Sequence, residues 1–112
     1  MDPHLKEQFV EALNNADEDK HCTLDLVKII DGDCHYCALG ILRHAVLKQR
    51  IIYDENDYAV ITGAHFEGPN ATYILPELHF KITLDEIHRI VTLNDEQNKT
   101  FKEIADYVHS HF

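Results

Sequence analysis

A chain of 112 residues has the length of a single domain, here residues 1–112. Its 45% hydrophobic and 27% charged residues are typical of a globular protein and exclude the disordered and fibrous classes. Twenty acidic residues against ten basic ones give a formal charge of −10, which disfavours direct binding to DNA or to an anionic membrane.

We expect neither a targeting segment nor a membrane span in this sequence. Its first residues are acidic and polar, and no apolar run approaches the ~20 residues that a membrane span needs. The three cysteines are odd in number, which favours reduced thiols over disulfides. We therefore expect a cytoplasmic protein.

The first third of the chain predicts one helix and one extended segment. Asp2 and Pro3 form a helix start, and the helix is expected to end between Asn15 and Glu18. The segment of residues 24–30 is short and rich in β-branched side chains, and the turn-forming residues Asp31-Gly32-Asp33 follow it. This pattern predicts a strand or an extended connection. The acidic run Asp17-Glu18-Asp19 is either a solvated surface or a decoy for a basic groove.

The middle of the chain predicts a buried helix followed by a small sheet. Apolar residues cover most of the circumference of a helix over residues 35–48, as in a central, buried helix, and Gly40 indicates close packing. Residues 51–76 hold three short β-prone runs, at 51–53, 58–62 and 72–75, separated by turn-forming residues.

Two helices are predicted at the C-terminal end, each from a Thr-x-x-Glu capping box. Thr83 with Glu86 begins the first, and Thr100 with Glu103 begins the second. The apolar stripes are Leu84, Ile87, Ile90 and Val91 in the first, and Phe101, Ile104, Ala105, Val108 and Phe112 in the second. The predicted fold is α+β, with a buried central helix, two C-terminal helices packed on it and a small antiparallel sheet.

The densest group of chemically active side chains is Cys34-His35-Tyr36-Cys37, placed at the start of the central helix. A thiol at a helix N-terminus has a lowered pKa, so Cys37 is a candidate nucleophile, with a base such as His65 or His79. The alternative is that Cys37 is a small buried hydrophobic residue. A zinc site completed by His21, Cys22 or His44 lacks a second paired motif, so we expect no metal and no cofactor.

Several segments resemble one widespread family of small, uncharacterised bacteriophage and prophage proteins. The similar segments are Tyr36-Cys37-Ala38-Leu39-Gly40-Ile41-Leu42, Leu75-Pro76, Leu93-Asn94-Asp95 and the run from Phe101 to Val108. The family reads Tyr-Cys-Cys-Leu-Gly-Val-Leu in the first segment, so Ala38 replaces its second Cys, and Thr100 replaces its usual Ser. The resemblance implies a phage context and a shared α+β fold, and it supplies no activity.

Within this resemblance, Cys37, Gly40, Asn94 and Asp95 occupy the motif positions. Asn94 and Asp95 admit a structural interpretation, in which Asn94 takes the left-handed conformation that ends a helix. In the alternative, both residues face the start of the central helix and bind an anion or a nucleotide there. We take Cys37, Gly40, Asn94 and Asp95 as the predicted ligand-binding residues.

The resulting hypothesis is a non-catalytic phage protein in the cytoplasm of an infected host cell. It would sequester a small, anionic, nucleotide-like ligand or block a host defence protein, and it could form a homo-oligomer. The alternative is a cysteine-dependent enzyme with Cys37 as the nucleophile.

Overall fold

The computed structural model describes residues 1–24, 27–46, 51–53, 59–61 and 81–112 of the chain. The first helix, α1, spans Pro3–Asn15, as the sequence predicted. Asp2 caps it by accepting a hydrogen bond from the backbone N–H of Leu5 at 3.0 Å. Its buried residues, Leu5, Phe9 and Leu13, follow the spacing of one helix face. A short 3₁₀ turn, η1 (Glu18–Lys20), follows α1.

A β-hairpin comes next, and half of it was not predicted. β1 (Val27–Ile30) pairs antiparallel with β2 (Asp33–Tyr36), so the predicted strand at 24–30 is confirmed in its second half. Asp31 and Gly32 both have positive φ, at 52° and 83°, as a two-residue hairpin turn of the mirror-image type requires. The prediction of a helix from residue 35 was wrong, because backbone pairing with β1 holds residues 33–36 extended.

The central helix therefore begins later than expected. α2 spans Ala38–Ile41 and continues without a break as a π-helix, η2 (Leu42–Val46), and the last two predicted positions lie outside the described residues. Every residue of α2 is buried, and so is Leu42, so the prediction of a buried central helix is confirmed. Cys37 is the N-cap of this helix, with an extended backbone at ψ 174°.

A second hairpin pairs β3 (Ile51–Tyr53) antiparallel with β4 (Ala59–Ile61). Both strands fall within runs that the sequence marked as β-prone. The third predicted run, residues 72–75, lies outside the described residues.

Both C-terminal helices begin at the predicted capping boxes. α3 spans Leu84–Val91 with Thr83 as its N-cap, and it continues as a π-helix, η5 (Thr92–Glu96). α4 spans Phe101–His111 with Thr100 as its N-cap. In each box the Thr hydroxyl accepts the backbone N–H of the Glu, and the Glu carboxylate accepts the backbone N–H of the Thr.

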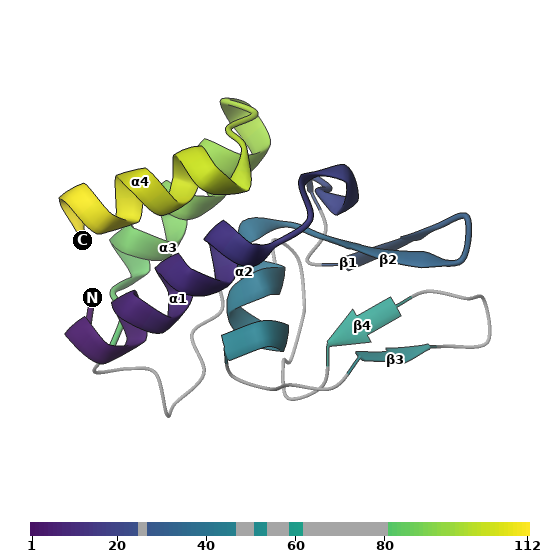
Figure 1. Ribbon diagram of the computed structural model, residues 1–112, viewed down its shortest axis with the longest axis horizontal. Helices are drawn as coiled ribbons and strands as arrows, with labels where there is room; N and C mark the ends of the chain where they lie inside the picture. Colours follow the sequence, from purple (N-terminus) through teal and green to yellow (C-terminus); the bar gives the residue numbers. More distant parts are fainter. Residues whose placement is uncertain (25–26, 47–50, 54–58, 62–80) are drawn as a thin grey trace.

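The helices pack around a shared core, and the β1–β2 hairpin extends from one end of this helical part (Figure 1). α4 packs along α1, α3 packs against α2, and both chain termini lie at the end opposite the hairpin. The predicted α+β class is confirmed. Leu84 departs from its predicted stripe, since it is 47% exposed while Ile87 and Ile90 are buried. None of the described helices is long and apolar enough to cross a membrane.

Candidate functional site

The side chain of Asn94 lies at the centre of a buried polar network. Asn94 is 2% exposed. Its Oδ1 accepts the backbone N–H of Ala38 at 3.0 Å and lies 2.6 Å from Nε2 of His21. Its Nδ2 donates to the carbonyl oxygen of Cys22 at 3.1 Å and to Oδ1 of Asp95 at 2.7 Å. Because Asn94 Oδ1 can only accept, Nε2 of His21 carries the proton in this pair.

Asn94 and Cys37 together satisfy the first N–H groups of α2. The backbone N–H of Ala38 donates a hydrogen bond to Oδ1 of Asn94, and the backbone N–H of Gly40 donates one to Sγ of Cys37 at 3.4 Å. The first N–H groups of a helix have no partner within the helix, and burying them unpaired would cost free energy. The network therefore stabilises the start of a helix that lies in the core.

His21 connects this network to the start of α4. Its ring stacks on Phe101, with 3.9 Å between centroids and 15° between planes. Glu18 of η1 accepts the backbone N–H groups of Phe101 at 2.9 Å and Lys102 at 3.1 Å. The segment between α1 and β1 thus contacts both the start of α4 and, through Asn94, the start of α2.

Next to this network, Asp95 stabilises an unusual backbone conformation of Leu24. Leu24 has a φ of 73°, in the left-handed region that β-carbons disfavour, and its side chain is 77% exposed. Oδ1 of Asp95 accepts the backbone N–H of Leu24 at 3.0 Å as well as the Nδ2 group of Asn94. The carboxylate therefore supports a strained residue.

The structure brings the four predicted site residues together. Cys37, Gly40 and Asn94 meet at the start of α2, and Asp95 is hydrogen-bonded to Asn94. An amide side chain has two donor hydrogens and two acceptor lone pairs, and Asn94 uses all four inside the protein. The ligand-binding role of these residues stays a prediction, and the hydrogen bonds favour a structural role.

One detail of the structural interpretation was wrong. Asn94 lies inside η5 and does not end it with a left-handed residue; the positive φ, 51°, belongs to Asn98. Sequence reasoning also missed Glu18 as a partner of α4 and considered His21 only as a metal ligand. Nothing local in the sequence marks these two residues, because their partners lie more than 70 positions away.

Cys37 is unsuited to nucleophilic chemistry. Burial raises the pKa of its thiol to about 12; the hydrogen bond from the N–H of Gly40 lowers it, and the nearby Cys22 and Asp95 raise it, but burial has the largest effect. The thiol therefore stays protonated at neutral pH, whereas the thiolate is the nucleophile. The proposed bases, His65 and His79, lie outside the described residues.

The cysteine and histidine residues do not converge on a metal-like arrangement in the described ranges. Within them, no group of three or more His, Cys, Asp or Glu side chains is placed to hold a metal ion.

Comparison with known proteins found no matching family model, no matching curated protein and no matching solved structure.

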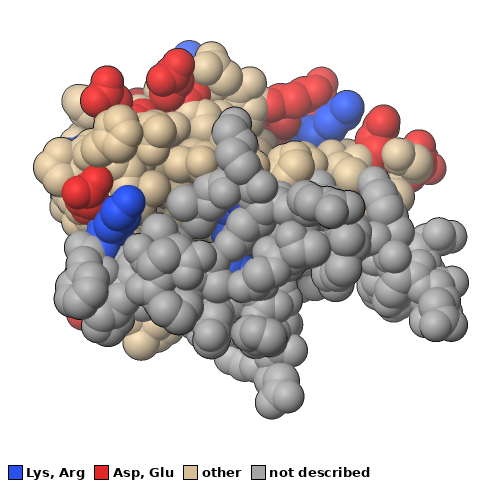
Figure 2. Space-filling view, turned by 90° about the horizontal axis from the view of Figure 1, so that it is seen from below, with Lys and Arg blue, Asp and Glu red and all other residues tan. Residues whose placement is uncertain are grey.

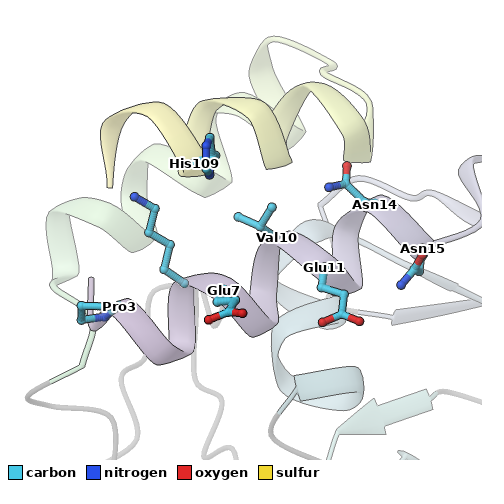
Figure 3. Close-up of a pocket in the computed structure, with 8 residues that line it drawn as sticks. Pro3, Glu7, Val10, Glu11, Asn14, Asn15 and His109 are labelled. Carbon is cyan, nitrogen blue, oxygen red and sulfur yellow. The ribbon is translucent and has the colours of Figure 1, made fainter.

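A groove between α1 and α4 is a second candidate site, and it was not predicted. It has a volume of about 550 Å³, and its accessible lining is mostly apolar. Val10 and Asn14 extend from α1 toward α4, and His109 lies on α4 (Figure 3). The residues along it are Pro3, Lys6, Glu7, Val10, Glu11, Asn14, Asn15 and His109.

The groove follows from how the two helices pack. α1 turns Leu5, Phe9 and Leu13 into the core, and the adjacent stripe containing Val10 lines the groove together with His109 of α4. Val10 is half-buried and packs against the core, the accessible lining of the groove is mostly apolar, and the charged residues Lys6, Glu7 and Glu11 lie along it. A second hollow, of about 390 Å³ between η5 and α4, is more polar.

Proposed function

We propose that the protein is a non-catalytic binding protein that occupies a surface of another protein. The observation that carries this proposal is the groove between α1 and α4, which is open, mostly apolar and bordered by charged side chains. Protein partners bind surfaces of this kind through an apolar centre and a polar rim. The acidic character of the chain favours a basic partner surface.

The buried network around Asn94 supports a binding role over catalysis or small-ligand capture. A catalytic Cys37 would need a thiolate and access to substrate, and burial opposes both. A nucleotide at the start of α2 would need backbone N–H groups that Ala38 and Gly40 already donate to Asn94 and Cys37. The groove keeps its polar groups on the surface, where a partner can reach them.

The biological setting that we propose is an infected bacterium. The resemblance of the Cys37 and Asn94 segments to phage and prophage proteins supports this setting. A small acidic protein in that setting can act by covering a basic surface of a host defence protein. Figure 2 shows acidic side chains spread over the described part of one face with basic side chains between them, and the acidic excess of the sequence fits such a role.

Site-specific photocrosslinking in bacterial cells tests the proposal. A photoreactive amino acid replaces Asn14, which is exposed in the groove, and in a matched control it replaces Gln8, which is exposed elsewhere on α1. We expect discrete adducts with another protein from position 14 and none from position 8. The adducts should disappear when the groove also carries Val10→Asp.

Two outcomes contradict the proposal. Identical adduct patterns from positions 14 and 8 would mean that contacts at the groove are nonspecific. An absence of protein adducts from position 14, together with a small-molecule mass increment on the purified protein, would instead favour capture of a small ligand.

A further inference from the structure

The proposed binding role leaves the chemistry of the partner open, and the groove itself constrains it. The lining residues run from Pro3 to Asn15, the whole length of α1. At 1.5 Å per residue this is about 18 Å, the length of a helix of about twelve residues. The groove is therefore long and straight, with the direction of a helix axis.

The walls of the groove favour the binding of a helical partner segment over the binding of an extended strand. α1 supplies every lining residue except His109, which α4 supplies, and the N–H and C=O groups of a helix interior are bonded within the helix. A strand laid along them would find no backbone partner for its own N–H and C=O groups, and leaving them unpaired costs free energy. A helix satisfies its own backbone groups and presents only side chains, as in helix-in-groove recognition.

The charged side chains on one rim of the groove favour a partner of the opposite charge. Glu7 and Glu11 lie four residues apart on α1, so they are neighbours on one helix face (Figure 3). Both are exposed, and no hydrogen bond or ion pair of either side chain is found among the described residues. Lys6 and His109 also line the groove, and the two unpaired carboxylates outnumber its one lysine. This acidic excess beside a mostly apolar lining suits a partner with basic residues beside an apolar ridge.

From these observations we infer that the groove binds an amphipathic helix of another protein, with an aliphatic ridge flanked by Lys or Arg residues about four positions apart. The ridge lies over Val10, and the basic side chains face Glu7 and Glu11. A second copy of this chain is a poor occupant, because each copy carries a charge of −10 and a symmetric contact would bring the same carboxylates together. This inference rests on the proposed binding role and specifies its partner.

The test uses a fluorescent synthetic peptide of about 14 residues. The peptide has leucines at helical spacing on one face and lysines four positions apart beside them; one control scrambles its order, and another replaces its lysines with glutamates. We expect anisotropy titrations to show binding of the basic amphipathic peptide, with binding at least about tenfold weaker for both controls.

Matched variants of the protein distinguish the effect of the two carboxylates in the groove from the effect of the overall charge of the protein. Glu7→Gln with Glu11→Gln removes two charges from the groove, and Asp33→Asn with Glu96→Gln removes two exposed charges elsewhere. The first pair should weaken peptide binding roughly fivefold and reduce its salt dependence, because exposed ion pairs each contribute modestly. The second pair should leave the affinity nearly unchanged.

A further variant tests the position of the helix. Asn14→Lys places a positive charge in the groove at an exposed position, where it should not disturb folding, and it should weaken binding of the basic peptide. Circular dichroism of each variant checks that the helices remain.

The outcomes distinguish this inference from the proposed function. Equal binding of the scrambled peptide, or equal losses from both charge pairs, overturns the inference. If the peptide fails to bind while position 14 still crosslinks to another protein, the inference falls and the binding role stands. A crosslinked homodimer from position 14 overturns the inference in favour of a second copy, and the absence of any groove-specific adduct removes the binding role itself.

Discussion

Nε2 of His21 lies 2.6 Å from Oδ1 of Asn94, although the two residues are 73 positions apart in the sequence, and Nδ2 of Asn94 donates a hydrogen bond to the carbonyl oxygen of Cys22. One buried side chain thus connects the segment after α1, the start of α2 and η5. Because each of these segments is irregular or lies at a helix end, its backbone groups need partners from elsewhere in the fold. Asn94 supplies those partners.

Replacing Asn94 should therefore strongly reduce stability. Asn94→Ala removes the buried hydrogen bonds that Asn94 makes with the N–H of Ala38 and the carbonyl of Cys22, and each loss costs about 1–3 kcal/mol. We expect a total loss of about 2–5 kcal/mol in the free energy of unfolding from urea titration. Gln97→Ala, an exposed change nearby, serves as the control. A loss below about 0.5 kcal/mol would mean that the network contributes little.

Asp95→Ala tests whether the second motif residue is structural or functional. The change removes the acceptor for the N–H of Leu24, so the left-handed conformation of Leu24 loses its support. We expect a loss of about 1–2 kcal/mol by urea titration, with crosslinking at the groove retained. A variant that keeps wild-type stability but loses partner binding would return Asp95 to the predicted binding site.

The last helix offers a comparison of a cap with a core residue. Thr100→Ala should cost about 1 kcal/mol because it removes one side of the capping box. Ile104→Ala should cost about 2–5 kcal/mol because Ile104 is fully buried and the change opens a cavity. Urea titration measures both. Near-zero losses in both variants would show that α4 is not docked on α1.

Local sequence signals predicted the helices well. The Asp2 cap, the two Thr-x-x-Glu boxes and the buried stripes of α1 and α4 all depend on residues within a few positions of one another. Such short-range patterns carry their own physical cause, so the sequence alone is sufficient to identify them.

The errors arose where distant residues decide the structure. Tyr36 is in a strand because β1 pairs with it, although the apolar pattern around it suits a helix. The proximity of Cys37 and Asn94 was anticipated, but the four partners of the Asn94 amide were not, since His21 and Cys22 give no local sign of them. The groove was also missed, because periodicity assigns Glu7, Val10 and Glu11 to the outer side of α1 and cannot show how α4 covers it.

Glu86 should make stability depend on pH. Burial opposes its ionisation, but hydrogen bonds from the Met1 ammonium group, at 2.6 Å, and from Thr83 outweigh it and lower the pKa of Glu86 below its usual 4.5. A carboxyl group with a lowered pKa in the folded state stabilises the protein above its unfolded pKa. That contribution is lost as pH falls through the folded value.

Urea titrations from neutral pH to about pH 3 measure this effect, with Glu86→Gln as the test variant. The wild-type protein should lose more stability over the acidic range than the variant, and the difference between them should shrink as pH falls below about 4.5. Glu96→Gln, at an exposed position, should follow the wild-type curve. Parallel curves for Glu86→Gln and wild type would show that the Met1 pair does not stabilise the fold.

Thiol labelling decides between the structural and nucleophilic interpretations of Cys37. Its side chain is 6% exposed and its thiol has a pKa of about 12, whereas Cys34 on β2 is half-buried. With iodoacetamide at mildly alkaline pH, the folded protein should therefore be modified first at Cys34, and Cys37 should react only after denaturation, as peptide mass mapping can show. Cys37→Ser should retain the fold, because serine is a good N-cap for the Gly40 N–H. Labelling of Cys37 faster than a small-molecule thiol in the folded protein would overturn the structural interpretation and favour the enzyme.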